Sequence, residues 1–125
     1  MTEFADAQAP LLCNTDAMME NPRDNPVLKR FRAAVRDTYG ERVERVVLFG
    51  SRARGDTRED SDYDVAVFLR DMGDRMTEMN CLADLSTDIL YDTGEFIHAM
   101  PYRAGFYNDP REPRMHEIRA EGIDL

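Results

Sequence analysis

The chain of 125 residues contains no tryptophan, one lysine (Lys29) and two cysteines. Cys13 and Cys81 show neither the paired spacing of a zinc site nor a disulfide framework, so nothing in the sequence indicates a structural metal or a disulfide bond. No stretch approaches the ~20 apolar residues that a membrane-spanning helix needs. The N-terminal segment carries Glu3 and Asp6 and has no long apolar core, so we expect no signal peptide and a cytoplasmic protein.

An excess of positive charge is also lacking. The chain has 25 acidic and 16 basic residues, which gives a net charge of -9. This balance argues against direct nucleic-acid binding, which favours a basic face. The acidic surface suits a basic protein partner, or serves only to keep the protein soluble. At this length the chain can bury a core as one domain.

The most informative pattern is a glycine–serine turn followed by two aspartates. Gly50 and Ser51 come after residues 43–49, a Val- and Leu-rich run that predicts a buried strand. Glycine lets the backbone turn tightly, and free N–H groups near a helix start at Ser51 would attract phosphate. Asp62 and Asp64 begin a second predicted strand, where side chains two residues apart share a face. Two such carboxylates suit magnesium, and magnesium suits nucleotidyl transfer.

A hairpin loop with a solvated run of charges is the alternative interpretation of this stretch. The stretch lacks the Gly-Lys-Ser/Thr ending of a Walker A loop, so it is not a P-loop. Arg52 is well placed to bind a phosphate through its planar guanidinium. Arg54 either does the same or pairs with Asp56 or Asp60 to hold the loop, and we favour the pairing.

The spacing of Gly50-Ser51 and Asp62-Tyr63-Asp64 resembles the minimal nucleotidyltransferases (MNT) of the DNA polymerase beta superfamily, over about residues 26–125. Many short members are antitoxins encoded beside a HEPN-domain toxin, an RNase, and transfer AMP from ATP to a tyrosine of that toxin. The resemblance implies the same activity here, with Mg²⁺ held by the two aspartates. It also implies an ATP site formed by Gly50, Ser51, Arg52 and Ser61.

The superfamily usually has a third carboxylate on a later strand, which the sequence places at residues 95–100. Glu95 is our candidate for this third catalytic carboxylate. Phe96 aligns where relatives often carry Asp, and a one-residue offset in a strand puts Glu95 on the other face. His98 shares a face with Phe96; it is either a base or, as we favour, a partly buried strand residue.

The remaining pattern predicts an α/β (α+β) domain with a small mixed β-sheet and helices packed against it. Asn25 is expected to cap a helix that starts at Pro26 and ends at Gly40. Residues 1–24 are expected to form an arm that is flexible or docks on a partner, and residues 25–125 the nucleotidyltransferase domain. Further predicted elements are a strand over 62–70, a helix over 75–91, a strand over 95–100, a loop over 101–110 and a helix over 111–121.

The apolar stripe of the helix over 75–91 is formed by Met79, Leu82, Leu85 and Ile89, and Met76 extends it. The loop over 101–110 carries three aromatic residues in six positions. These residues are Tyr102, Phe106 and Tyr107. They form either a partner-binding or adenine-stacking surface, or a cover for one edge of the core.

Three functions remain open at this point. The first is the enzyme described above. The second is a non-catalytic antitoxin that neutralises its toxin by binding, which the uncertain third carboxylate favours. The third is nucleotidyl transfer to a small molecule, for which 125 residues leave little room for a separate substrate domain.

Overall fold

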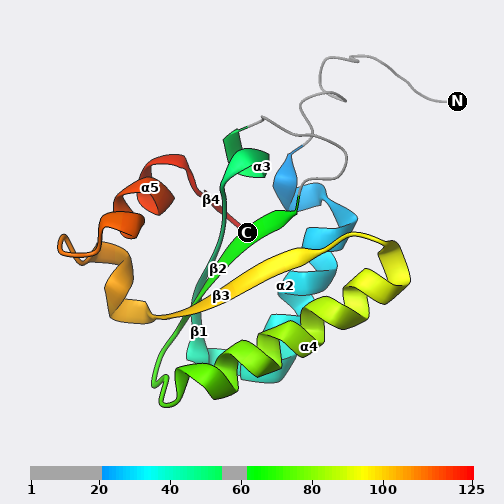
Figure 1. Ribbon diagram of the computed structural model, residues 1–125, viewed down its shortest axis with the longest axis horizontal. Helices are drawn as coiled ribbons and strands as arrows, with labels where there is room; N and C mark the ends of the chain where they lie inside the picture. Colours follow the sequence, from blue (N-terminus) through cyan, green and yellow to red (C-terminus); the bar gives the residue numbers. More distant parts are fainter. Residues whose placement is uncertain (1–20, 55–61) are drawn as a thin grey trace, which may run out of the picture.

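A computed structural model describes residues 21–54 and 62–125, which form a mixed four-stranded sheet (Figure 1). The strand order is β3-β2-β1-β4, and β2 runs parallel to β3 and antiparallel to β1. This arrangement confirms the predicted α/β class with a mixed sheet. The strands are β1 Val43–Phe49, β2 Tyr63–Leu69, β3 Ile97–Arg103 and β4 Ile123–Asp124.

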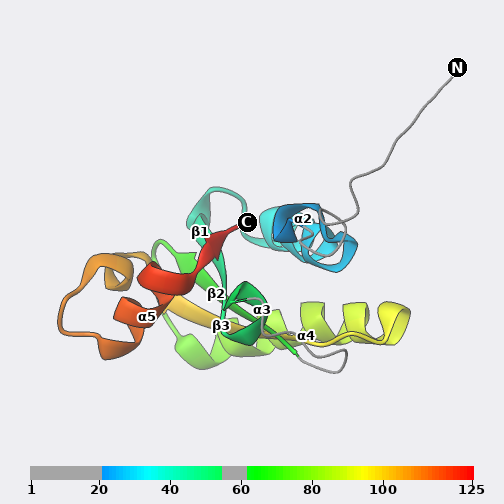
Figure 2. The same ribbon diagram turned by 90° about the horizontal axis from the view of Figure 1, so that it is seen from above.

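Helices cover both faces of the sheet (Figure 2). The two long helices, α2 (Pro26–Tyr39) and α4 (Arg75–Thr93), pack on one face, and α5 (Pro113–Glu121) packs on the other. Among the described residues, no helix is long and apolar enough to span a membrane. The short helices are η1 Pro22–Asp24, η2 Gly40–Arg42, α3 Ser51–Arg54 and η3 Ala104–Asn108.

Helix α2 forms as the sequence predicts. The Asn25 side chain accepts hydrogen bonds from the N–H groups of Val27 (2.8 Å) and Leu28 (3.2 Å), and proline follows at the first helical position. Gly40 follows the last helical residue with a φ of 57°, which glycine adopts without strain. The predicted apolar face is buried in the larger core cluster: Leu28, Phe31, Val35 and Tyr39.

Helix α4 runs two residues beyond its predicted end. Gly94 follows in the left-handed conformation, and its N–H donates to the Leu90 carbonyl. Within the predicted stripe, Leu82 and Ile89 are buried, whereas Met76 is 61% exposed. The prediction that Met76 extends the stripe is therefore wrong, because its side chain faces solvent, although Glu78 in the same turn is buried.

The predicted strand over 95–100 and loop over 101–110 need correction. Strand β3 starts at Ile97 and continues through Pro101 to Arg103, and residues 104–108 form η3. Pro101 is tolerated because β3 is an edge strand that pairs with β2 alone, so a missing N–H on the outer side removes no ladder hydrogen bond. Strand β4, whose two residues pair with Val47 and Leu48, was not predicted because it is too short to show a pattern.

The three late aromatics belong to the core. Tyr102 is 7% exposed and stacks on Phe68 with ring centroids 5.6 Å apart. Tyr107 meets the same ring edge-on at 5.3 Å, and Phe106 packs against this second core cluster. Of the two interpretations, covering one edge of the core is the one that the packing supports.

The predicted N-terminal arm falls largely on residues 1–20, which lie outside the described residues. Its last residues do touch the domain, because the Nε of Arg23 donates to the Asp124 carbonyl at 2.7 Å. Cys81, on α4, is partly buried against the larger core cluster, in keeping with a small apolar packing residue.

Candidate active site

The glycine–serine turn lies where β1 ends and the short helix α3 begins. Gly50 has a φ of 80°, and its carbonyl accepts hydrogen bonds from the N–H groups of Ala53 and Arg54, both at 3.1 Å. A Cβ atom on Gly50 would lie 2.5 Å from Oδ2 of Asp64. Glycine is therefore required at this position for two reasons: the positive φ angle and the close approach of the Asp64 carboxylate.

The structure places the two predicted carboxylates at the start of β2. Asp64 pairs with Phe49 across the antiparallel ladder, and its side chain is 36% exposed. Asp62 immediately precedes β2 and is exposed. Ser61, the predicted nucleotide contact, lies outside the described residues, as do Asp56 and Asp60.

An open cleft of about 690 Å³ adjoins these groups. Gly50, Ser51 and Asp64 line one end of it, and Asp62 is not among its described lining residues. A volume of this size suits one nucleotide-sized ligand. The floor is formed by the β3 side chains His98, Met100 and Tyr102.

The third predicted carboxylate does not lie beside Asp64. The neighbour of Asp64 on β3 is His98, whose Nδ1 is 3.6 Å from Oδ1 of Asp64. The His98 side chain is 57% exposed, so it belongs to the cleft rather than to the core, contrary to the interpretation that we favoured. Within residues 21–54 and 62–125, no three His, Cys, Asp or Glu side chains are grouped as a metal site.

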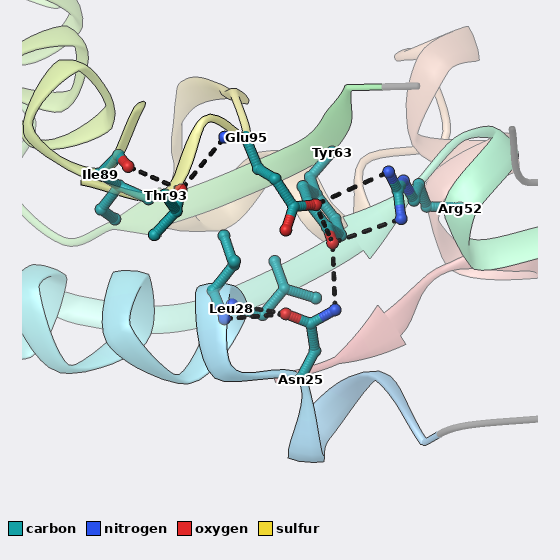
Figure 3. A network of polar contacts seen from close by, with 8 residues as sticks. Asn25, Leu28, Arg52, Tyr63, Ile89, Thr93 and Glu95 are labelled. Carbon is teal, nitrogen blue, oxygen red and sulfur yellow. Dashed lines mark hydrogen bonds and ion pairs between the residues drawn. The ribbon is translucent and has the colours of Figure 1, made fainter. Parts of the chain in front are cut away.

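Glu95 instead belongs to a polar cluster that involves the hydroxyl of Tyr63 (Figure 3). This hydroxyl donates to Oε1 of Glu95 at 2.9 Å and accepts from Nδ2 of Asn25 at 3.0 Å. Tyr63 neighbours Asp64 in β2, so the two side chains point to opposite faces of the sheet. Burial, the largest cause, raises the pKa of the Tyr63 hydroxyl, which is only 3% exposed as a residue.

Arg52 joins the same cluster (Figure 3). Its guanidinium carbon lies 4.1 Å from the centroid of the Tyr63 ring, and its Nη1 donates to the Tyr63 hydroxyl at 3.3 Å. Its Nη2 is 3.9 Å from the Glu95 carboxylate. The Arg52 side chain, which we predicted to contact phosphate, is therefore turned toward Tyr63. Arg52 is not among the described residues that line the cleft.

Three arginines do line the cleft. Arg54 extends from α3 and forms an ion pair with Glu121 of α5 at 3.2 Å. Arg75 and Arg114 line the cleft from the first turns of α4 and α5. Sequence reasoning missed Arg75 and Arg114, because both lie outside the motif and only the folded sheet brings them to it.

Comparisons with known proteins identify the family. Residues 28–109 match the family model described as a nucleotidyltransferase domain. Two similar proteins of Methanocaldococcus jannaschii both carry the name "putative protein adenylyltransferase". The first is 32% identical over 85 residues, which cover 68% of this chain and 79% of the relative. The second is 39% identical over 46 residues, which cover 37% of this chain and 46% of the relative.

A solved structure shares the fold. It is described as a crystal structure of a toxin–antitoxin with AMP-PNP, and it matches with a TM-score of 0.54 and 15% identity. The match covers 75% of this chain and 68% of that one. Because the family model matches residues 28–109 and the first relative is 32% identical over 68% of this chain, the chain belongs to the nucleotidyltransferase family.

Proposed function

We propose that this nucleotidyltransferase is an antitoxin that transfers AMP from ATP to a tyrosine hydroxyl of a HEPN-domain toxin encoded nearby. The observation that carries the proposal is the close packing of Asp64 against the Gly50 turn, at one end of an open cleft. This places a carboxylate directly beside backbone N–H groups that suit phosphate. The name of the two archaeal relatives supports a protein acceptor.

The donor set fits magnesium. Asp62 and Asp64 would supply hard carboxylate oxygens, and the partial exposure of Asp64 leaves room for water and phosphate oxygens as further ligands. Magnesium bound there would neutralise charge that develops on the phosphates. The neighbour of Asp64 on β3 is the His98 imidazole, with Nδ1 3.6 Å from Oδ1 of Asp64, rather than a third carboxylate.

The residues of the chain then act by positioning the phosphates of ATP. The N–H groups of the turn at Gly50 and Ser51 hold the phosphates of ATP, and Asp64 fixes the α-phosphate end beside the cleft. The acceptor hydroxyl forms a bond to the α-phosphorus and releases its proton to solvent. The bond from the α-phosphorus to the oxygen that bridges to the β-phosphorus breaks, and pyrophosphate leaves.

The toxin partner follows from the antitoxin assignment, and the net charge of -9 favours a basic surface on it. The fold shared with a structure described as a toxin–antitoxin is consistent with this partner.

The test uses the purified chain, magnesium, α-labelled ATP and the product of the neighbouring gene. We expect the wild type to label the partner and the Asp62→Asn, Asp64→Asn double variant to lose several orders of magnitude in rate. Asp88→Asn, which changes an exposed aspartate on α4, is the matched control and should label normally. Near-normal labelling by the double variant would show that the aspartates are not the metal site.

A second candidate is an antitoxin that neutralises its toxin by binding alone. The histidine beside Asp64, in place of a carboxylate, is the observation that favours it. In this case wild type and double variant would both bind and inhibit the partner without label. Label on a small molecule, with the partner unmodified, would instead support the third function.

A further inference from the structure

The cleft extends well beyond the turn and Asp64. Its floor is the face of β3 that carries His98, Met100 and Tyr102, since alternate residues of a strand share a face. His98 pairs with Asp64, and the five residues from His98 to Tyr102 span about 13 Å of strand. The cleft therefore has one end at Asp64 and another at Tyr102.

The Tyr102 end is basic. The guanidinium carbon of Arg75 lies 5.6 Å from the centroid of the Tyr102 ring. Helix α5 begins just after η3, which follows β3, and ends where Glu121 meets Arg54 of α3 (Figure 1). Arg114, in the first turn of α5, thus lines the cleft toward the same end. Glu117 of α5 also lines the cleft, but Arg75 and Arg114 outnumber it, so this end carries an excess of positive charge that suits an anionic ligand.

The geometry of transfer decides which substrate reaches this end. The attacking and leaving oxygens lie roughly in line through the reacting phosphorus. The sheet order places β1, and the turn at Gly50 that follows it, on one side of β2, and β3 on the other. If the pyrophosphate group lies on the turn, the attacking hydroxyl must approach Asp64 from the β3 side. The nucleoside half of ATP carries no charge, so it gives the two arginines no anionic partner.

We propose that the β3 floor binds the acceptor as an extended segment, and that Arg75 and Arg114 recognise acidic side chains near its tyrosine. This inference rests on the proposed function and specifies its acceptor. At ~3.3–3.6 Å per extended residue, the span from Asp64 to the arginines places the acidic side chains roughly three or four residues from the tyrosine. Guanidinium groups suit carboxylates because they bind them through two parallel hydrogen bonds.

The test uses two synthetic peptides with a single tyrosine. One carries glutamates roughly three and four residues away on each side, and the other carries glutamines at the same positions. With the full chain, magnesium and α-labelled ATP, we expect the glutamate peptide to be labelled with about tenfold higher kcat/KM. The Arg75→Ala, Arg114→Ala double variant should lose this preference while its KM for ATP stays unchanged.

Arg111→Ala is the control, because Arg111 pairs with Asp109, has an 87% exposed side chain and does not line the cleft. It should keep the preference for the glutamate peptide. Equal labelling of both peptides by the wild type, or a preference kept by the double variant, overturns the inference. A raised KM for ATP in the double variant also overturns it, since the arginines would then bind the nucleotide.

Calorimetry with magnesium and AMP-PNP separates this inference from the proposed function. Wild type that binds AMP-PNP but labels both peptides equally, or neither, rejects only the acidic acceptor. Wild type that neither binds AMP-PNP nor labels the partner protein rejects the proposed function as well.

Discussion

The guanidinium of Arg52 rests on the ring of Tyr63, with its carbon 4.1 Å from the ring centroid. This contact joins the helix that follows the Gly50 turn to the strand that carries Asp64, on the face of the sheet opposite that carboxylate. Because the Tyr63 hydroxyl also bonds to Asn25 and Glu95, the turn is tied to the start of α2 and to the segment before β3. Arg52 therefore supports the Gly50 turn from the face of the sheet opposite the Asp64 carboxylate.

Tyr63→Phe tests this role. The change keeps the ring beneath Arg52 but removes the hydroxyl that bonds to three side chains, so we expect unfolding to become easier by about 1–2 kcal/mol. The KM for ATP should also rise, because the turn is less firmly held. Denaturant unfolding and steady-state kinetics measure the two effects. Tyr91→Phe, at an 82% exposed position, is the control and should change neither quantity.

Glu95→Gln tests the prediction that Glu95 is the third catalytic carboxylate. The structure shows Glu95 accepting a hydrogen bond from Tyr63, which a glutamine carbonyl can also accept, though more weakly. We therefore expect turnover within a few-fold of wild type and an unchanged magnesium requirement. Asp64→Asn, run in parallel, should lose most activity. A loss in Glu95→Gln as large as that in Asp64→Asn would place Glu95 in the catalytic machinery.

Gly50→Ala should abolish transfer through two separate effects. The positive φ costs an L-residue about 1–2 kcal/mol, and the new Cβ would collide with Oδ2 of Asp64. Gly94→Ala is the matched control, since Gly94 has a φ of 79° but nothing within 4 Å of its Cβ position. Thermal unfolding should show both variants destabilised, and only Gly50→Ala should lose magnesium-dependent activity. Equal activity in the two variants would contradict the role given to this contact.

His98→Asp should tighten magnesium binding. The change places a carboxylate beside Asp64, and a greater negative charge on the ligands raises affinity for a hard cation. We expect the half-saturating magnesium concentration for ATP turnover to fall by about tenfold. His116→Asp adds the same charge on an exposed position of α5 outside the cleft, so it should leave the magnesium dependence unchanged.

Alkaline pH should destabilise the protein through two buried tyrosines. Burial is the largest cause that raises the pKa of Tyr39, which lies near Glu78 and Cys81, and burial likewise raises the pKa of Tyr63. A raised folded-state pKa gives stability that is fully present below the unfolded value of 10.0 and is lost as pH rises above it. The loss is at most about 1.4 kcal/mol per pH unit for each group.

Tyr39→Phe removes one of these groups. We expect its free energy of unfolding, measured with urea between about pH 9 and 11, to fall less steeply than that of the wild type. An identical slope in the two proteins would show that the Tyr39 hydroxyl does not contribute to the alkaline loss.

Some elements of this fold were predictable because their signals are local. The Asn25 cap and Pro26 fix the start of α2, and the hydrophobic run over 43–49 gives β1 its observed bounds. Strand β3 was misplaced because Pro101 reads locally as a loop signal, and only its position at the sheet edge makes a proline acceptable there.

Local sequence patterns were enough to predict one end of the candidate site. The order of glycine, serine and two aspartates, placed around two strands, indicates a nucleotide and a metal wherever the strands pair, because strand periodicity and turn geometry are local properties. Only the tertiary structure decided which residues lie beside Asp64 and which line the cleft. Parallel pairing of β2 with β3 set His98, rather than Glu95, beside Asp64, and the return of α5 over the sheet brought Arg114 into the cleft. Such contacts depend on register and packing between distant segments, which no local pattern encodes.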